Sequence, residues 1–165
     1  MMKKVIVIGC PGGGKSTFSR ALQTVTGLPL HHLDQLYWNA DRTAVSEDIL
    51  EERIGNVLQQ DAWILDGDYH RTLEMRLRAC DTVFFLDYSA EICLAGITAR
   101  LGVKRPDMPW VEEKPDPELF ELIHAYSLEK KPDILRLLQQ YPEKQIVIFR
   151  DRDDASSYLL NLQEK

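Results

Sequence analysis

Residues 9–17 read GCPGGGKST, and this stretch decides the fold. It follows a short apolar run at 3–9 and precedes residues 15–26, whose pattern predicts a helix that ends near Gly27. Residues 9–16 match the complete phosphate-binding loop (P-loop) pattern, Gly-x-x-x-x-Gly-Lys-Ser, in the strand-then-helix setting that the motif requires. The sequence therefore predicts a nucleoside triphosphate site at this turn.

Each residue type in this loop suits a phosphate. Glycines at 12–14 permit positive φ and bring backbone N–H groups close to an anion at the positive end of a helix dipole. Lys15 supplies a charge for the β- and γ-phosphates, and the Ser16 hydroxyl is a ligand for Mg²⁺. We interpret Cys10 as a packing residue. We expect ATP to contact nine consecutive residues, namely Gly9, Cys10, Pro11, Gly12, Gly13, Gly14, Lys15, Ser16 and Thr17.

Strand and helix patterns alternate along the rest of the 165 residues. The predicted strands are continuous apolar runs, which are typical of a parallel sheet covered on both faces. They lie at 28–33, 62–66, 82–87 and 145–149, and helices are expected at 46–60, 71–79, 90–101, 118–128, 131–140 and 153–163. Four prolines make 102–117 a loop. We therefore predict a single α/β domain over 1–165, with its ligands at the carboxyl ends of the strands.

Composition disfavours several functional classes. The formal net charge of −6 disfavours direct nucleic-acid binding, and no apolar stretch approaches the roughly 18 residues of a membrane span. The three cysteines form no CxxC pair, so we expect a reduced, cytoplasmic protein, either a monomer or a homodimer. We interpret short basic clusters, such as Arg76 with Arg78, as solvated surface. No Asn-Lys-x-Asp stretch is present to recognise guanine.

Acidic residues follow three of the predicted strands. Asp66 ends AWILD and Asp87 ends VFFLD, and either carboxylate suits a water of the Mg²⁺ shell, although Asp87 also suits a helix cap. Asp34 follows the strand at 28–33, where it either positions and deprotonates an acceptor hydroxyl or forms a turn. Tyr37 and Trp38 follow in an expected loop, either stacked on a base or sugar or buried in the core.

Several arginines lie where loops leave the predicted sheet. Arg100 and Arg105 come at the end of a predicted helix and in the loop beyond it. They either stabilise that helix end or belong to a short lid over the phosphates. Arg71, shortly after the third strand, is a candidate to hold the acceptor, and Arg150 and Arg152 are weaker candidates to border the base.

The ordered set of these segments resembles the adenylate-kinase-like group of P-loop kinases and, within it, the bacterial topology modulation protein family. The likeness covers nearly the whole chain and rests on GCPGGGKSTFSRAL, HLDQLYW, WILDGDY, VFFLD, RPDM and IVIFR. It implies a three-layer sandwich around a five-stranded parallel sheet of order 2-3-1-4-5, as in nucleoside monophosphate kinases. It also implies an acceptor-binding segment at 35–60 and a short lid-like loop at 100–117.

The resemblance also assigns roles to single residues. DGDYHR is similar to the Asp-Gly-Phe-Pro-Arg of adenylate kinases, which favours Asp66 over Asp87 as the carboxylate linked to Mg²⁺. Arg100 falls where those enzymes place a lid arginine on the donor phosphates, whereas Gly96 replaces a second one. Their arginine for an acceptor monophosphate is missing, and the aromatic pair at 37–38 occupies that stretch.

Motifs and resemblance together predict an ATP- and Mg²⁺-dependent kinase that acts on a small molecule: a nucleoside, a nucleotide or a hydroxylated metabolite. The expected catalytic residues are Lys15, Asp34, Asp66, Arg71 and Arg100. We expect Arg100 and Arg105 to contact ATP together with the nine P-loop residues. Ser16 and Asp66 are the expected metal ligands. Two alternatives stay open. One is an ATP-dependent regulator that acts through a partner or DNA, as the name of the topology modulation family suggests, and the other is a slow ATPase.

Overall fold

A five-stranded parallel sheet forms the centre of the computed structural model, which describes all 165 residues. The strands are β1 (Lys4–Gly9), β2 (Leu30–His32), β3 (Trp63–Asp66), β4 (Thr82–Leu86) and β5 (Gln145–Phe149). Their order is β2-β3-β1-β4-β5, which confirms the predicted 2-3-1-4-5. Every residue of β3 and β4 is buried, and this explains why their sequences are apolar without alternation.

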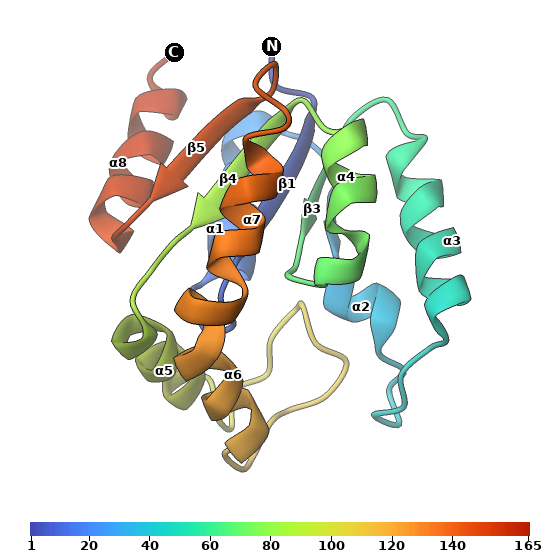
Figure 1. The fold of residues 1–165 in the computed structure, drawn as a ribbon, viewed down its shortest axis with the longest axis vertical. Helices are drawn as coiled ribbons and strands as arrows, with labels where there is room; N and C mark the ends of the chain where they lie inside the picture. The colour runs from blue at the N-terminus through green and yellow to red at the C-terminus, as the bar shows by residue number, and fades with distance from the viewer.

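Helices cover both faces of this sheet, so the predicted three-layer α/β arrangement is confirmed (Figure 1). The helices are α1 (Lys15–Thr26), α2 (Leu33–Tyr37), α3 (Glu47–Leu58), α4 (Leu73–Ala79), α5 (Ala90–Ala99), α6 (Pro117–Glu129), α7 (Lys131–Leu138) and α8 (Arg152–Gln163), with a 3-10 turn η1 (His70–Thr72). Helices α1 and α8 contact each other on one face, and α4 and α7 lie on the other. None of these helices combines the length and the apolar character that crossing a membrane requires.

One helix, α2, is absent from the sequence-based expectations, which place a loop there. It has only five residues, too few for an apolar periodicity, and its N-cap residue His32 makes no side-chain cap. Tyr37 and Trp38 are half-buried rather than free in a loop. The Tyr37 ring lies 4.7 Å from that of Tyr69, and the Trp38 ring lies 5.4 Å from that of Trp110. These contacts stabilise the short helix next to the strand ends.

The predicted loop between α5 and α6 is confirmed, because residues 100–116 contain no helix or strand. It runs across the carboxyl ends of the strands, beside α2 and opposite the end of the molecule that carries both termini (Figure 1). The Gln35 side chain of α2 donates a hydrogen bond to the carbonyl of Pro106 in this loop. The loop ends at Asp116, whose side chain caps α6 by accepting from the N–H of Glu118 at 3.0 Å.

Gly55, in the interior of α3, offers a simple test of local packing. A Cβ placed there would meet only the Met75 methyl at 3.7 Å, which is ordinary van der Waals contact. Because alanine loses less backbone entropy than glycine in a helix, we expect Gly55→Ala to raise the free energy of unfolding by about 0.5–1 kcal/mol. Urea denaturation measures this change, and a lower midpoint would contradict the packing described here.

Candidate active site

The P-loop (residues 9–16) connects β1 to α1 at the carboxyl end of the sheet. Gly12 and Gly14 have φ of +80° and +86°, in the left-handed region that glycine adopts at little cost. At Gly12, a Cβ would also lie 2.1 Å from the carbonyl oxygen of Cys93 in α5. The loop therefore needs glycine both for its conformation and for its close contact with α5.

Lys15 spans the mouth of the P-loop. Its Nζ donates to the carbonyl oxygens of Gly9 at 2.9 Å and Cys10 at 3.1 Å. Helix α1 begins at Lys15, and no side chain caps its N-terminus, so its first N–H groups remain available to an anion. The ammonium group and the helix dipole thus place positive charge at one point.

A first cavity of about 550 Å³ opens over the P-loop and α5. It is rich in positive charge, since five cationic side chains line it together with three carboxylates. The cations are Lys15, Arg20, Arg100, Arg105 and Arg152. Such a lining, at the N-terminus of a helix, suits a polyphosphate.

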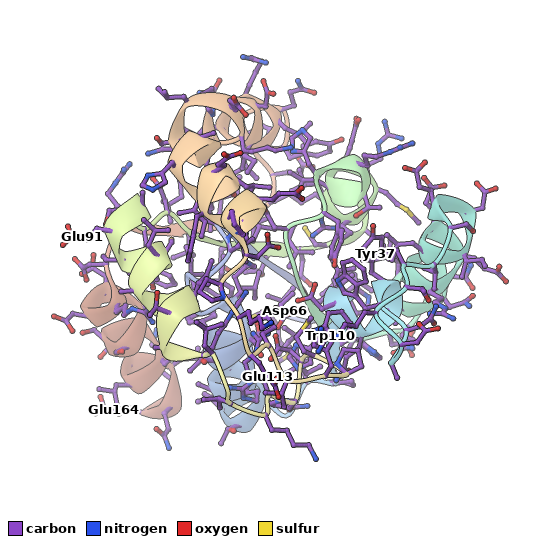
Figure 2. The ribbon with its side chains drawn as sticks, turned by 90° about the horizontal axis from the view of Figure 1, so that it is seen from below. Tyr37, Asp66, Glu91, Trp110, Glu113 and Glu164 are labelled. Carbon is purple, nitrogen blue, oxygen red and sulfur yellow. The ribbon has the colours of Figure 1, made fainter.

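A second cavity of about 630 Å³ adjoins the first under the loop at 100–116. Its wall is partly apolar, with Trp38, Met108, Trp110, Leu119 and Leu122, and also contains carboxylates of the β3 and α2 region. Figure 2 views this end of the molecule, with Asp66 and Trp110 both labelled near its centre. Five residues line both cavities, namely Lys15, Asp34, Gly67, Arg100 and Arg105.

The two candidate magnesium carboxylates lie in different surroundings. Asp66 lines the first cavity, and the parallel register of β2 and β3 places His32 beside it, with Nδ1 2.7 Å from Asp66 Oδ2. Asp87 lines neither cavity. Its Oδ2 instead lies 2.8 Å from Lys131 Nζ and 3.2 Å from Arg150 Nη1. The structure therefore places Asp66, and not Asp87, in the cavity over the P-loop.

The donor atoms near the P-loop fit a magnesium ion that arrives with a nucleotide. Ser16 and Asp66 both line the first cavity. Asp66 Oδ1 makes no hydrogen bond within the protein, whereas Ser16 Oγ accepts from Arg20 at 2.5 Å. No group of three or more His, Cys, Asp and Glu side chains is placed to hold a metal. Mg²⁺ commonly takes one or two protein oxygens and completes its shell with phosphate and water, which matches this donor set.

Asp34, in the first turn of α2, lies where the two cavities meet. Its Oδ1 accepts a hydrogen bond from the Tyr69 hydroxyl at 2.6 Å. Burial raises the pKa of Asp34 above its ordinary value of 3.8, and the Tyr69 hydrogen bond and the charge of Lys15 offset part of that rise. The carboxylates of Asp107 and Asp66 add to the rise. A carboxylate with a raised pKa is a stronger base for a hydroxyl proton.

Arg100 and Arg105 reach the same place from the loop after α5. Arg105 pairs with Asp107 at 3.2 Å and with Glu112 at 3.3 Å. Arg100 Nε lies 3.3 Å from Glu112 Oε2, but this buried nitrogen makes no well-directed hydrogen bond. Burial lowers the pKa of Arg100, and the neighbouring charge of Arg105 lowers it further. Two guanidinium groups thus share the Glu112 carboxylate beside a cavity suited to an anion.

The interpretation of Arg76 and Arg78 as solvated surface holds for Arg78, which is exposed, and is wrong for Arg76 of α4. Its side chain is fully buried, and burial lowers the pKa of Arg76 to about 10. The guanidinium donates to Thr72 Oγ1 at 3.1 Å and to the carbonyls of Gly67 at 3.2 Å and Tyr69 at 2.8 Å. Arg76 therefore holds the loop after β3 in shape. The sequence does not reveal this, because the partners are mostly backbone carbonyls.

Arg71 is expected from the sequence to hold the acceptor, but the structure places it outside both cavities. The turn η1 directs its side chain outward, where it is 73% exposed and pairs with Glu47 of α3. Arg152 is instead brought to the P-loop, since it lines the first cavity and its Nη2 donates to the carbonyl of Gly12 at 3.5 Å. Arg150 pairs with Asp87 outside the cavities.

The expected ATP contacts divide into three groups. Gly12, Gly14, Lys15, Ser16 and Thr17 line the first cavity, Pro11 lines the second, and Gly9, Cys10 and Gly13 line neither. Cys10 is buried, as its interpretation as a packing residue requires. Gly96 of α5 faces the first cavity and presses on the P-loop, because a Cβ there would lie 2.0 Å from the carbonyl oxygen of Gly12.

Sequence comparisons with known proteins find distant relatives among kinases. No family model matches the chain. Adenylate kinases from Thermotoga petrophila and Thermotoga maritima are each 27% identical to it over 89 residues. The match covers 53% of this chain and 40% of each relative, so the aligned part is less than half of those enzymes.

Solved structures of small kinases share the fold over the whole chain. Shikimate kinase from Bacteroides thetaiotaomicron superposes with a TM-score of 0.58 at 19% identity, covering 99% of this chain and 98% of that one. A sugar kinase from Janibacter sp. HTCC2649 superposes with a TM-score of 0.57 at 13% identity, covering 99% and 91%. The chain therefore has the fold of the small P-loop kinases, with distant similarity to adenylate, shikimate and sugar kinases.

Proposed function

We propose that this protein transfers the γ-phosphoryl group of ATP to a small-molecule acceptor. The observation that carries the proposal is the meeting of two cavities at Lys15, Asp34, Arg100 and Arg105. The first cavity has the charge that a triphosphate requires, and the second has the mixed polar and aromatic lining of a small-molecule site. The distant similarity to kinases supports the same class of reaction.

The residues of this chain act by binding and positioning. Lys15 and the P-loop amides bind the β- and γ-phosphates, while Arg100 and Arg105 exchange their carboxylate partners for phosphate oxygens. For a hydroxyl acceptor, Asp34 takes the hydroxyl proton as the new P–O bond forms. The bond from the γ-phosphorus to the β-phosphate oxygen then breaks, and ADP leaves. Ser16 and Asp66 would hold Mg²⁺, which would supply charge neutralisation for the phosphates.

The proposal is tested by ³¹P NMR of ATP incubated with the protein, Mg²⁺ and a panel of nucleosides, nucleotides and hydroxylated metabolites. We expect a new phosphorylated product with at least one acceptor, and ADP formed in equal amount. Hydrolysis to inorganic phosphate that no compound suppresses would instead support a slow ATPase.

Asp34→Asn separates the function of this residue from its effect on stability. We expect turnover to fall about 10²-fold, because an amide cannot take the hydroxyl proton. In the native protein, activity should rise with pH through the raised pKa of Asp34, and this acid limb of the pH profile should disappear in the variant.

The Asp34→Asn variant should be more stable than the native protein at neutral pH, because the buried charge is removed. That gain should shrink as the pH falls toward 3.8, where the native carboxyl is protonated as well.

Activity assays over a pH series, paired with thermal melts of both proteins, test these expectations. Unchanged turnover, or an acid limb that persists in Asp34→Asn, would contradict the assigned role.

Asp66→Asn tests the magnesium assignment. We expect it to raise the Mg²⁺ concentration for half-maximal turnover about tenfold, because one negative ligand oxygen is lost. Asp87→Asn is the matched control, since Asp87 follows the next strand but pairs with Lys131 and Arg150 outside the cavities. A magnesium titration that shifts for Asp87→Asn and not for Asp66→Asn would reverse the assignment.

In this proposal, any effect on DNA topology of the kind that the name of the topology modulation family suggests is indirect. A kinase that alters a metabolite or nucleotide pool is able to affect DNA topology without touching DNA, and the net charge of −6 supports this route. If ATP changed the affinity of the protein for DNA or for a partner protein and no acceptor were phosphorylated, the regulator alternative would replace the kinase. The cytoplasmic location and the choice between monomer and homodimer stay predictions.

A further inference from the structure

The second cavity contains a second enclosed carboxylate, Asp68, two residues after the end of β3. The Tyr126 hydroxyl of α6 donates to Asp68 Oδ1 at 3.1 Å, just as the Tyr69 hydroxyl donates to Asp34 Oδ1 at 2.6 Å. The other oxygen of each carboxylate makes no hydrogen bond and no ion pair within the protein. Two aspartates, each fixed by one tyrosine, therefore offer an unpaired oxygen to the same cavity.

Both carboxylates are half-buried and line the second cavity. The Tyr126 hydroxyl is the one side-chain group that hydrogen-bonds to Asp68. Arg76 is committed to Thr72 and two backbone carbonyls and forms no ion pair with Asp68. Asp68 is thus half-buried, and its second oxygen keeps a hydrogen-bonding capacity that the protein does not use and that a ligand in the cavity can reach.

The cations of this cavity are poorly placed for an anionic acceptor. Three of them, Lys15, Arg100 and Arg105, also line the first cavity, where they face the donor phosphates. Arg42 lies over the Trp110 ring, with its guanidinium carbon 5.6 Å from the ring centroid. Only Lys130 remains, and its charge acts on Asp68. A phosphate or carboxylate here would meet the carboxylates of Asp34 and Asp68, and Arg42 is the one guanidinium group of this lining that does not also line the first cavity.

The remaining wall suits the face of a ring. Trp38 and Trp110 pack edge to face at 5.4 Å, and Leu119 and Leu122 of α6 continue the apolar surface. Aromatic side chains bind both the flat face of a nucleobase and the C–H face of a sugar.

We propose that Asp34 and Asp68 together bind an uncharged acceptor through two neighbouring hydroxyl groups. This inference rests on the proposed kinase function and names its acceptor class: a neutral, polyhydroxylated compound with a ring face, which a sugar or a nucleoside provides. Asp34 receives the proton of the reacting hydroxyl, and Asp68 accepts a hydrogen bond from the adjacent hydroxyl. The ring then lies against Trp38 and Trp110, and a phosphorylated or carboxylated analogue is rejected.

The test uses the full chain saturated with Mg²⁺ and a non-hydrolysable ATP analogue. Thermal shift and calorimetry compare neutral probes with their anionic counterparts. The pairs are adenosine, cytidine, guanosine and uridine with their 5′-monophosphates and glucose with glucose 6-phosphate, and shikimate is added as a carboxylate. We expect at least one neutral probe to raise the melting temperature beyond the analogue alone and to bind about tenfold or more tightly than its anionic counterpart. Comparing the nucleosides with glucose shows whether the acceptor is a nucleoside or a sugar.

Asp68→Asn then tests the residue itself. With the best neutral acceptor, we expect KM to rise about tenfold or more while kcat changes less than about threefold, since Asp68 binds the acceptor and does not take its proton. The affinity for the ATP analogue should be unchanged. Asp61→Asn, an exposed aspartate after α3, is the surface control. Tyr126→Phe removes the hydroxyl that donates to Asp68 and should also raise KM. This variant replaces Asp68→Asn in the test if Asp68→Asn does not fold.

The outcomes separate this inference from the function on which it rests. Binding and phosphorylation of the monophosphates, with KM unchanged or lower in Asp68→Asn, would overturn the inference and leave the kinase intact. A screen in which the ATP analogue binds but no neutral probe does would overturn it as well. Failure of the ATP analogue to bind would remove the proposed function first, and the inference with it.

Discussion

Lys15→Met is expected to lower ATP turnover about 10³-fold while leaving the melting temperature within a few degrees of that of the native protein. In the structure, Lys15 Nζ is held by the carbonyls of Gly9 and Cys10 at the mouth of the P-loop, where both cavities meet. Charge that forms on the transferred phosphoryl group would lose its nearest fixed cation, and a loss of this kind costs about 10²–10³-fold or more. Turnover is measured with the best acceptor, or as slow ATP hydrolysis where none is found.

Lys144→Met is the matched control. Lys144 also donates to two backbone carbonyls, those of Arg78 at 3.3 Å and Cys80 at 2.7 Å, but it lines neither cavity. We expect this variant to lose some stability and to keep its turnover. If Lys15→Met retained full turnover, or if both lysine variants lost it equally, the P-loop mechanism would not hold.

Gly96→Ala is expected to lower kcat/KM for ATP about 10²- to 10³-fold, although Gly96 carries no functional group. A Cβ at this position would lie 2.0 Å from the carbonyl oxygen of Gly12, so α5 and the P-loop would have to move apart by more than about 1 Å. Displacement of catalytic groups on that scale costs about 10²-fold, and the weaker binding of the phosphates adds to this. The affinity for the ATP analogue should therefore fall together with turnover.

Gly55→Ala controls for the general effect of replacing a helix glycine, because it makes the same change where a Cβ has room. An unchanged ATP affinity in Gly96→Ala would show that the contact between α5 and the P-loop is not as tight as described. The same contact disfavours any side chain at 96, because its Cβ would collide with the P-loop.

The P-loop and the parallel sheet could be predicted because their signals are local. The glycines at 12 and 14, the lysine that follows and the apolar runs of the strands each lie within a few residues of the structure they specify. The strand order came from a resemblance over the whole chain and agrees with the structure.

Features that depend on contacts between distant segments could not be predicted in this way. Arg76 is polar and sits in a short helix, yet its hydrogen bonds to the loop after β3 bury it completely. Arg71 follows that loop closely in sequence, yet η1 turns it toward Glu47. No local sequence pattern marks Asp68 as a site residue, because the hydroxyl that orients it belongs to Tyr126, 58 positions further along the chain.

Calorimetric titration of the folded protein with a non-hydrolysable ATP analogue and Mg²⁺ tests the central claim most directly, because every proposed step begins with a triphosphate on the P-loop. We expect one analogue per chain, with a dissociation constant of about 0.1 mM or tighter and about a tenfold or greater weakening in Lys15→Met. No heat of binding at about 1 mM analogue, from protein that circular dichroism shows to be folded, would contradict the account.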